Sequence, residues 1–158
     1  MKLCRLLMGF LTTAFLLAAA GTGSASDGLI TKPSAHSASA TLDRLEAALK
    51  ERGYMIFARI DHSAAAKAFN LKMPPATVLV FGNPGNGTQA MIRKPMLAID
   101  LPQKALVWED SGGKVSVTYN SAEYVQGTIF PRHGLPANPD RQKALEILLN
   151  EATDKATR

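Results

Sequence analysis

Hydrophobic residues recur at helical spacing in two long segments of the chain. In residues 41–52 the leucines and one alanine fall on one face, acidic residues come early, basic residues come late, and Gly53 ends the run. In residues 139–152 alanines and leucines again form a single stripe. We expect an amphipathic helix in each segment.

Four shorter segments have the residue pattern of β-strands. Residues 54–60 are rich in aromatic and branched side chains, and residues 77–81 form an apolar run between a proline and a glycine. Residues 104–109 and 114–119 are separated by Asp-Ser-Gly-Gly, which predicts that they form a β-hairpin.

Polar and glycine-rich segments connect these elements. Ser63 is the expected N-cap of a short helix over residues 63–70. Residues 82–87, Gly-Asn-Pro-Gly-Asn-Gly, predict a loop that precedes another short helix over residues 88–94. After about one helical turn that follows the hairpin, residues 127–138 are expected to form a long loop.

The order of these elements predicts an α+β fold. The hairpin indicates a mainly antiparallel sheet, and the two long helices are expected to cover one of its faces, giving a two-layer sandwich. Residues 26–40 are either a linker or a first edge strand, and their small, polar side chains slightly favour a linker. Residues 41–158 are expected to form one domain, since a mature chain of about 133 residues suits a single core.

The first residues have the layout of a secretory signal peptide. Lys2 and Arg5 give a positive start, an almost wholly apolar stretch follows, and Gly23-Ser24-Ala25 provides the small residues that a signal peptidase requires. The apolar stretch, about 15 residues, is shorter than the roughly 20 that span a bilayer. We therefore expect cleavage of residues 1–25 rather than a retained anchor, no stable membrane span afterwards, and a periplasmic or secreted protein.

The composition of the chain argues against cysteine chemistry and against nucleic-acid binding. The only cysteine, Cys4, precedes the apolar stretch, so the mature chain would contain no disulfide, thiolate nucleophile or cysteine zinc site. The chain has 18 basic and 13 acidic residues, and loss of Lys2 and Arg5 would lower its formal charge from +5 to +3. The remaining basic residues are dispersed without interleaved aromatic residues, so nucleic acid is not an expected partner.

Several segments, taken in order, resemble the bacterial and archaeal DUF302 domains, also called TT1751-like. The matching segments are Arg59-Ile60-Asp61-His62, Phe81-Gly82-Asn83-Pro84 with Gly87-Thr88, Ile99-Asp100-Leu101-Pro102, residues 104–110 and residues 117–120. The resemblance implies a β-α-β(4)-α core like that of the TATA-binding-protein fold, extra short helices in the connections, and a homodimer. The family has no established activity, so the resemblance implies neither a reaction nor a cofactor.

The candidate site centres on Asp61 and His62, where the strand of residues 54–60 gives way to a helix. An imidazole titrates near neutrality and coordinates metals or haem, and an aspartate can either orient it or cap the helix. Together with Asn83 and Asp100, these residues are the expected ligand-binding set. Three hypotheses stay open: a dimeric binding or sensing module for a small ligand or a protein, an enzyme with His62 as general acid or base, and a purely structural dimerisation module.

Other chemical signals in the sequence are weaker. The spacing Gly-x-x-x-x-Gly-Thr in residues 82–88 is similar to a phosphate-binding loop, but the decisive lysine is missing, and a turn with positive φ is the simpler interpretation. Trp108 and Tyr119 are expected in the core or a dimer interface. The four methionines beyond the signal segment are not clustered as in a copper site. No dedicated metal-ligand spacing links the candidate oxygen and nitrogen ligands, which are Asp61, His62, Asp100, Glu109 and His133.

Overall fold

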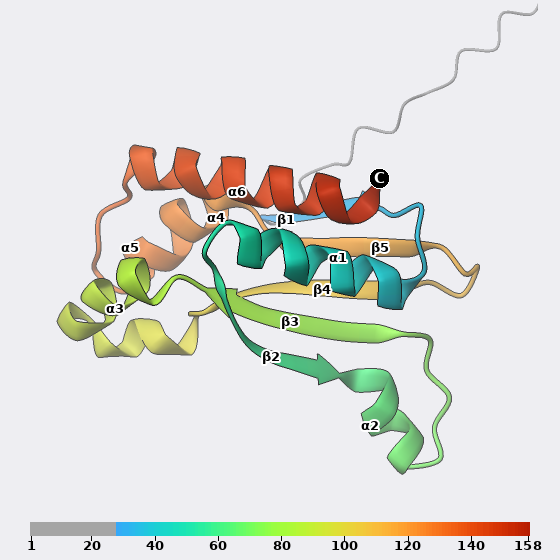
Figure 1. Cartoon of the computed structure of the whole chain (residues 1–158). Coiled ribbons are helices and arrows are strands. Elements are labelled where there is room, and N and C mark those ends of the chain that lie inside the picture. Colours follow the sequence, from blue (N-terminus) through green and yellow to red (C-terminus); the bar gives the residue numbers. More distant parts are fainter. Residues whose placement is uncertain (1–27) are drawn as a thin grey trace, which may run out of the picture.

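A five-stranded antiparallel sheet organises residues 28–158, the part of the chain that the computed structural model describes (Figure 1). The strands, from one edge to the other, are β1 (Leu29–Pro33), β5 (Val115–Asn120), β4 (Gln103–Glu109), β3 (Ala76–Gly82) and β2 (Met55–Asp61). The predicted α+β class and the hairpin of β4 and β5 are confirmed. The predicted signal segment lies outside the described residues.

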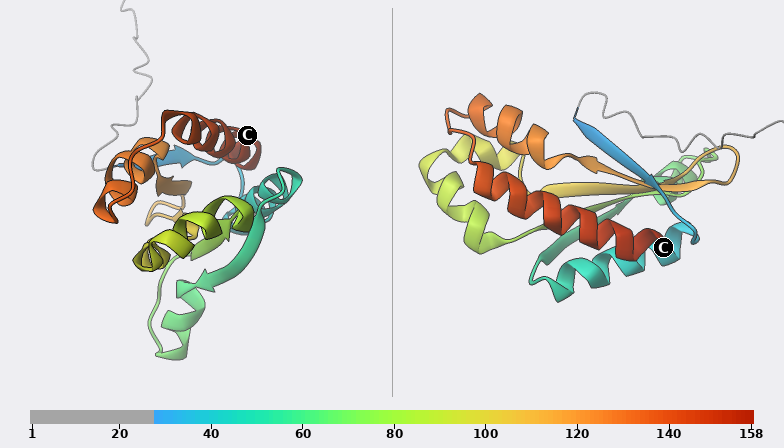
Figure 2. Two further views of the ribbon diagram at one scale, coloured as in Figure 1. Left: turned by 90° about the vertical axis from the view of Figure 1, so that its left-hand side faces the viewer. Right: turned by 90° about the horizontal axis from the view of Figure 1, so that it is seen from above.

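Two long helices, α1 (Ala38–Glu51) and α6 (Pro139–Thr157), lie side by side on one face of the sheet (Figure 2). Their apolar stripes pack on β3, β4 and β5 and form the main core, in which Leu45, Leu49 and Leu79 are fully buried. Burial of each such side chain contributes roughly 1.5–3 kcal/mol. The periodicity of the sequence therefore predicted both helices correctly, although α6 continues past residue 152 to Thr157.

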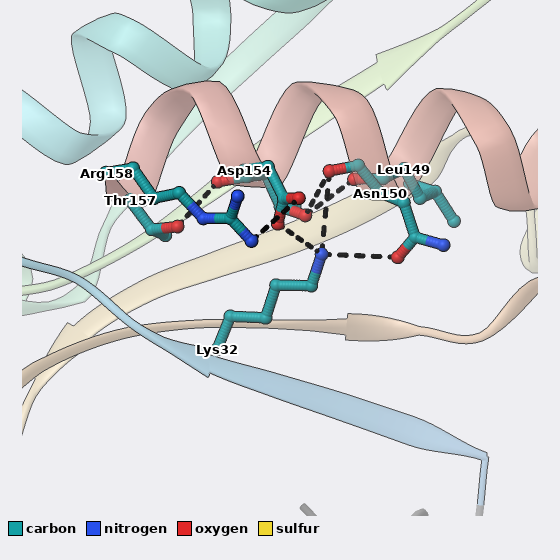
Figure 3. A network of polar contacts seen from close by, with 7 residues as sticks. Lys32, Leu149, Asn150, Asp154, Thr157 and Arg158 are labelled. Carbon is teal, nitrogen blue, oxygen red and sulfur yellow. Dashed lines mark hydrogen bonds and ion pairs between the residues drawn. The ribbon is translucent and has the colours of Figure 1, made fainter.

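Residues 29–33 form an edge strand and not a linker. β1 pairs antiparallel with β5, and Lys32 connects it to α6 (Figure 3). Lys32 Nζ donates hydrogen bonds to Asp154 Oδ1 at 2.9 Å and to Asn150 Oδ1 at 3.2 Å. The hydrogen bond from Lys32 holds the pKa of Asp154 below its ordinary value. The polar composition that favoured a linker reflects a strand with one side in solvent.

The short helix α2 (His62–Ala68) begins one residue before its predicted start and has a different cap. Asp61, not Ser63, is the N-cap, because Asp61 Oδ1 accepts a hydrogen bond from the backbone nitrogen of Ala64 at 2.9 Å. The hydroxyl of Ser63 donates to the same oxygen at 2.6 Å. Ser63 therefore supports the cap from inside the helix.

The predicted glycine-rich loop is wrong, because helix α3 (Pro84–Arg93) begins inside it. Asn83 caps this helix, and Pro84 occupies a first-turn position, where the missing N–H costs nothing. Gly82, Gly85 and Gly87 all lack the positive φ that the turn interpretation required. The cap from Asn83 and the favourable position of Pro84 stabilise the start of this helix and outweigh the poor helix propensity of glycine.

The first half of the predicted loop over residues 127–138 is also helical. α4 (Ala122–Tyr124), the π-helical segment η2 (Val125–Ile129) and α5 (Phe130–Arg132) follow one another without interruption. Their apolar side chains join α3 and the 3-10 helix η1 (Pro95–Ile99) in a second core cluster, with Leu97 fully buried. Burial of this stripe outweighs the weak propensity of Gly127 and the β-branched residues around it.

Both long helices cover the same face of the sheet, and we call the other face the open face (Figure 2). Side chains alternate along a strand, so Val78 and the paired Ile60 and Leu106 point to this open face, as does Trp108. Trp108 is half-buried there, and its Nε1 donates to Thr118 Oγ1 at 2.9 Å. Tyr119, in contrast, is buried in the main core.

Candidate functional site

A cavity of about 220 Å³ lies at the end of the sheet where β3 ends and β4 begins. Phe81 in β3 pairs with Gln103 in β4, so the segment that leaves β3 and the segment that enters β4 meet at this end. The start of β2, the η2 segment and the first turns of α6 supply the other sides. Segments distant in sequence therefore meet around one cavity.

Apolar side chains form most of the cavity wall, with a few polar groups among them. The apolar members are Tyr54, Phe57, Pro84, Met91, Leu101, Pro102, Val125, Phe130, Ala144 and Leu145. The polar members are Asn83, Asn86, Gln103, Gln126 and Arg141. Among residues 28–158, Arg141 is the only charged residue that lines the cavity. A concave apolar site with a few polar groups is typical of small-molecule binding sites.

Asn83 is the predicted site residue that lies in this wall. Its Oδ1 accepts a hydrogen bond from the backbone nitrogen of Gly85 at 3.0 Å, and this bond starts α3. The side chain therefore has a structural role as well as a place in the cavity.

Asp100 is close in sequence to the cavity wall but bonds elsewhere. Its Oδ2 accepts a hydrogen bond of 2.6 Å from Nε2 of His133, whose side chain is 5% exposed. Arg132 lies 3.5 Å from the same carboxylate, and Lys104 donates to the backbone oxygen of Asp100. The hydrogen bond from His133 is the main reason that the pKa of Asp100 is lowered. This pair joins the end of η1 to the end of α5.

Asp61 and His62 lie at the opposite end of the sheet. Asp61 pairs with Thr77 near the start of β3, whereas the part of β3 that lines the cavity is Gly82, about 17 Å away along the strand. The four predicted site residues therefore do not form one cluster. Hydrogen bonds from Ser63 and Ala64 lower the pKa of Asp61, and the exposed imidazole of His62 makes no hydrogen bond to any of residues 28–158.

Sequence reasoning missed Gln126 and Arg141, the two side chains with most to offer a ligand. Gln126 is 3% exposed and lies at the end of the segment for which the sequence predicts about one helical turn, directly before the expected loop. Arg141 is on the polar side of an amphipathic helix, where an arginine normally faces water. The π-helical segment is a signal for a functional site, but only the structure shows it.

The sequence profile of one family, the domain of unknown function DUF302, matches residues 30–155. The chain belongs to the DUF302 family. Among solved structures, the crystal structure of an uncharacterised conserved DUF302 protein from Bacillus stearothermophilus matches with a TM-score of 0.67 and 17% identity. The match covers 83% of this chain and 99% of that one, and it confirms the fold of this DUF302 domain.

Curated relatives of this DUF302 domain come from Brucella. The fluoride-specific ion channel FluC 1 of Brucella suis biovar 1 is 42% identical over 113 residues, which cover 72% of this chain and 43% of the relative. The protein of the same name from Brucella abortus biovar 1 is also 42% identical over 113 residues, with 40% of its length covered. The chain thus spans less than half the length of these relatives.

Two further features concern the described residues as a whole. No helix among residues 28–158 has both the length and the apolar character to cross a membrane. In the same part of the chain, no three histidine, cysteine, aspartate or glutamate side chains are grouped closely enough to hold a metal ion.

Proposed function

We propose that this DUF302 domain is an exported, dimeric binding or sensing module that holds a small ligand in the cavity at the end of β3. The cavity carries this proposal, because it combines an apolar wall with a buried amide and a single cationic side chain. Each of these groups is suited to binding, and none is a nucleophile next to a base, the arrangement that covalent catalysis requires.

The geometry around His62 supports binding over catalysis. A general acid or base acts on a substrate within hydrogen-bond reach, whereas His62 lies on an exposed helix start far from the cavity. An enzyme that uses His62 would need its substrate at that exposed surface. We therefore assign the ligand to the cavity.

Native mass spectrometry of the protein purified from its own cells tests this proposal. We expect the mass of a chain cleaved after Ala25, twice that mass for the dimer, and a retained small molecule. Ala144 is exposed and lines the mouth of the cavity, so Ala144→Trp should block it and abolish retention. Ala47→Trp, on the exposed side of α1, is the matched control and should retain the molecule.

The Brucella relatives favour one narrower candidate. Because the names of these relatives describe fluoride-specific ion channels, we also propose that the domain responds to fluoride. Sodium fluoride should then raise the melting temperature of the purified domain more than sodium chloride does at the same ionic strength. Equal effects of the two salts would contradict this candidate and leave the cavity proposal standing.

A further inference from the structure

The side chain of Gln126 is buried and only half satisfied. Its Oε1 accepts a hydrogen bond from the backbone nitrogen of Asn138 at 3.2 Å, and this is its only side-chain hydrogen bond to residues 28–158. Since a backbone N–H needs an acceptor, the bond identifies the oxygen and leaves the NH₂ group as a free donor. The hydroxyl of Tyr119 is the only buried side-chain polar atom without a hydrogen-bond partner among residues 28–158, so the NH₂ group of Gln126 is accessible from the cavity that it lines. It can therefore donate to a bound molecule that carries an acceptor.

The charge in the cavity wall points to an anionic acceptor. Arg141 makes no ion pair with any of residues 28–158, and no acidic residue lines the cavity in that part of the chain. The ten-residue helix α3 and the 19-residue helix α6 both contribute first-turn residues to the wall. The positive ends of the two helix dipoles add to the attraction for an anion.

The size and the apolar wall of the cavity restrict that anion. A volume of about 220 Å³ equals the liquid volume of roughly seven water molecules, enough for a small organic molecule. Inorganic anions are strongly hydrated and gain nothing from aromatic and aliphatic walls, so the fluoride response proposed above would use a site other than this cavity. A compact ligand with an apolar body and one negatively charged end would match both the apolar wall and the polar groups of Gln126 and Arg141.

We propose that the cavity binds a small monocarboxylate with an aliphatic or aromatic body. The carboxylate receives hydrogen bonds from the NH₂ group of Gln126 and from the guanidinium of Arg141, and the body packs against the apolar wall around Phe57 and Phe130. This inference rests on the proposed binding function and adds the class of ligand.

Titration of the purified mature protein with straight-chain carboxylates of increasing length and with benzoate tests the inference. Hexanol and hexanamide serve as neutral probes with a similar body, and inorganic phosphate serves as an anion without one. Binding is followed by calorimetry and by the NMR signals of the Gln126 side-chain amide. We expect these signals to move most with carboxylates, to move less with hexanol and hexanamide, and to stay unchanged with phosphate.

Variants assign the two recognition groups. Arg141→Ala should weaken carboxylate binding at least tenfold and leave the binding of hexanol unchanged. Gln126→Glu keeps the size of the side chain and places a negative charge beside the carboxylate, so it should abolish carboxylate binding while hexanamide still binds. Lys143→Ala, an exposed cation on α6 outside the cavity wall, is the control and should bind like the wild type. Circular dichroism confirms that each variant is folded.

The outcomes separate the ligand class from the binding function. Equal affinity for hexanol and hexanoate, or carboxylate binding that survives Arg141→Ala, would overturn the carboxylate assignment but keep the binding module. Failure of every organic probe to bind, together with no retained molecule in native mass spectrometry, would overturn both.

Discussion

Asp100 and His133 join the segment that enters β4 to the end of α5 through a hydrogen bond of 2.6 Å, with the imidazole almost fully buried. The acceptor is a carboxylate, and a hydrogen bond to a charged acceptor is stronger than one between neutral groups. Arg132 and Lys104 add positive charge on the same side. The pair therefore fixes the connection between η1 and β4, which includes two residues of the cavity wall.

Loss of the charge on Asp100 is expected to lower stability in a pH-dependent way. Because folding lowers the pKa of Asp100 from its ordinary value of 3.8, the contribution of the pair is complete above that value and is lost as the pH falls through the lowered pKa. At pH 7, Asp100→Asn should reduce the free energy of unfolding by about 1 kcal/mol.

Urea unfolding at neutral and acidic pH measures this effect. The difference between the wild type and Asp100→Asn should shrink as the pH falls below 3.8 and through the lowered pKa of Asp100, because the wild-type carboxylate is then protonated as well. Glu146→Gln, an exposed carboxylate on α6 without an ion pair among residues 28–158, should show no such trend. A difference that is constant with pH would show that the charge does not matter.

Gly28 and Gly53 together allow the effect of close side-chain packing to be separated from the effect of backbone strain. Both have positive φ, +78° and +74°, but a Cβ atom on Gly28 would lie 2.5 Å from the ring of Tyr124, whereas one on Gly53 would meet nothing within 4 Å. Gly53→Ala should cost about 1–2 kcal/mol, from the left-handed backbone alone. Gly28→Ala should cost about 2–5 kcal/mol, since overpacking is added. Equal losses in thermal unfolding would contradict the close packing of Gly28 on Tyr124.

The roles of Asp61 and His62 are separable by substitution. Asp61→Ala removes the cap of α2 and should lower the melting temperature by a few degrees, while Asp61→Ser keeps a capping oxygen and should restore most of the loss. His62→Ala should leave both stability and ligand retention unchanged, because the imidazole is exposed and outside the cavity. Loss of ligand retention in His62→Ala without a loss of stability would place the ligand-binding site at Asp61 and His62 and not in the cavity.

The spacing of hydrophobic residues along the sequence predicted most of the fold but little of the candidate site. The stripes of α1 and α6 and the hairpin of β4 and β5 are local patterns, and each has a direct signature in sequence. The cap of α2 shows the limit of such signatures, because Asp61 and Ser63 are both good capping residues and only their geometry decides between them. The long-range meeting of Asn83, Gln126 and Arg141 has no local signature at all.

A second limit concerns residues 122–132. Gly127, the β-branched neighbours of Gln126 and Pro131 argue individually against a helix, yet the segment is helical because its apolar side chains complete the second core cluster. Such tertiary burial depends on α3 and η1, which lie far away in sequence. The same packing holds Gln126 at the cavity, so the residue could not be recognised before the fold was known.

The open face of the sheet is the expected interface of the proposed homodimer. Ile60, Leu106 and Trp108 give it an apolar surface, and Lys104, near one end of β4, is the only charged strand residue that points to it within the described sheet. Two copies can therefore meet through this face without opposing like charges, with their sheets about 10 Å apart as in a sandwich. A stable interface would bury roughly 800 Å² on each partner.

Light scattering over a range of protein concentrations, coupled to size-exclusion chromatography, tests this interface. Ile60→Glu places a charge on the open face, and it should weaken dimerisation at least tenfold, equivalent to ~1.4 kcal/mol. Ile147→Glu is the matched control, because Ile147 lies on α6 and is 43% exposed compared with 47% for Ile60. Both variants should remain folded, and only the first should become monomeric. A wild type that is monomeric at all concentrations, or a dimer that survives Ile60→Glu and dissociates with Ile147→Glu, would exclude the open face as the interface.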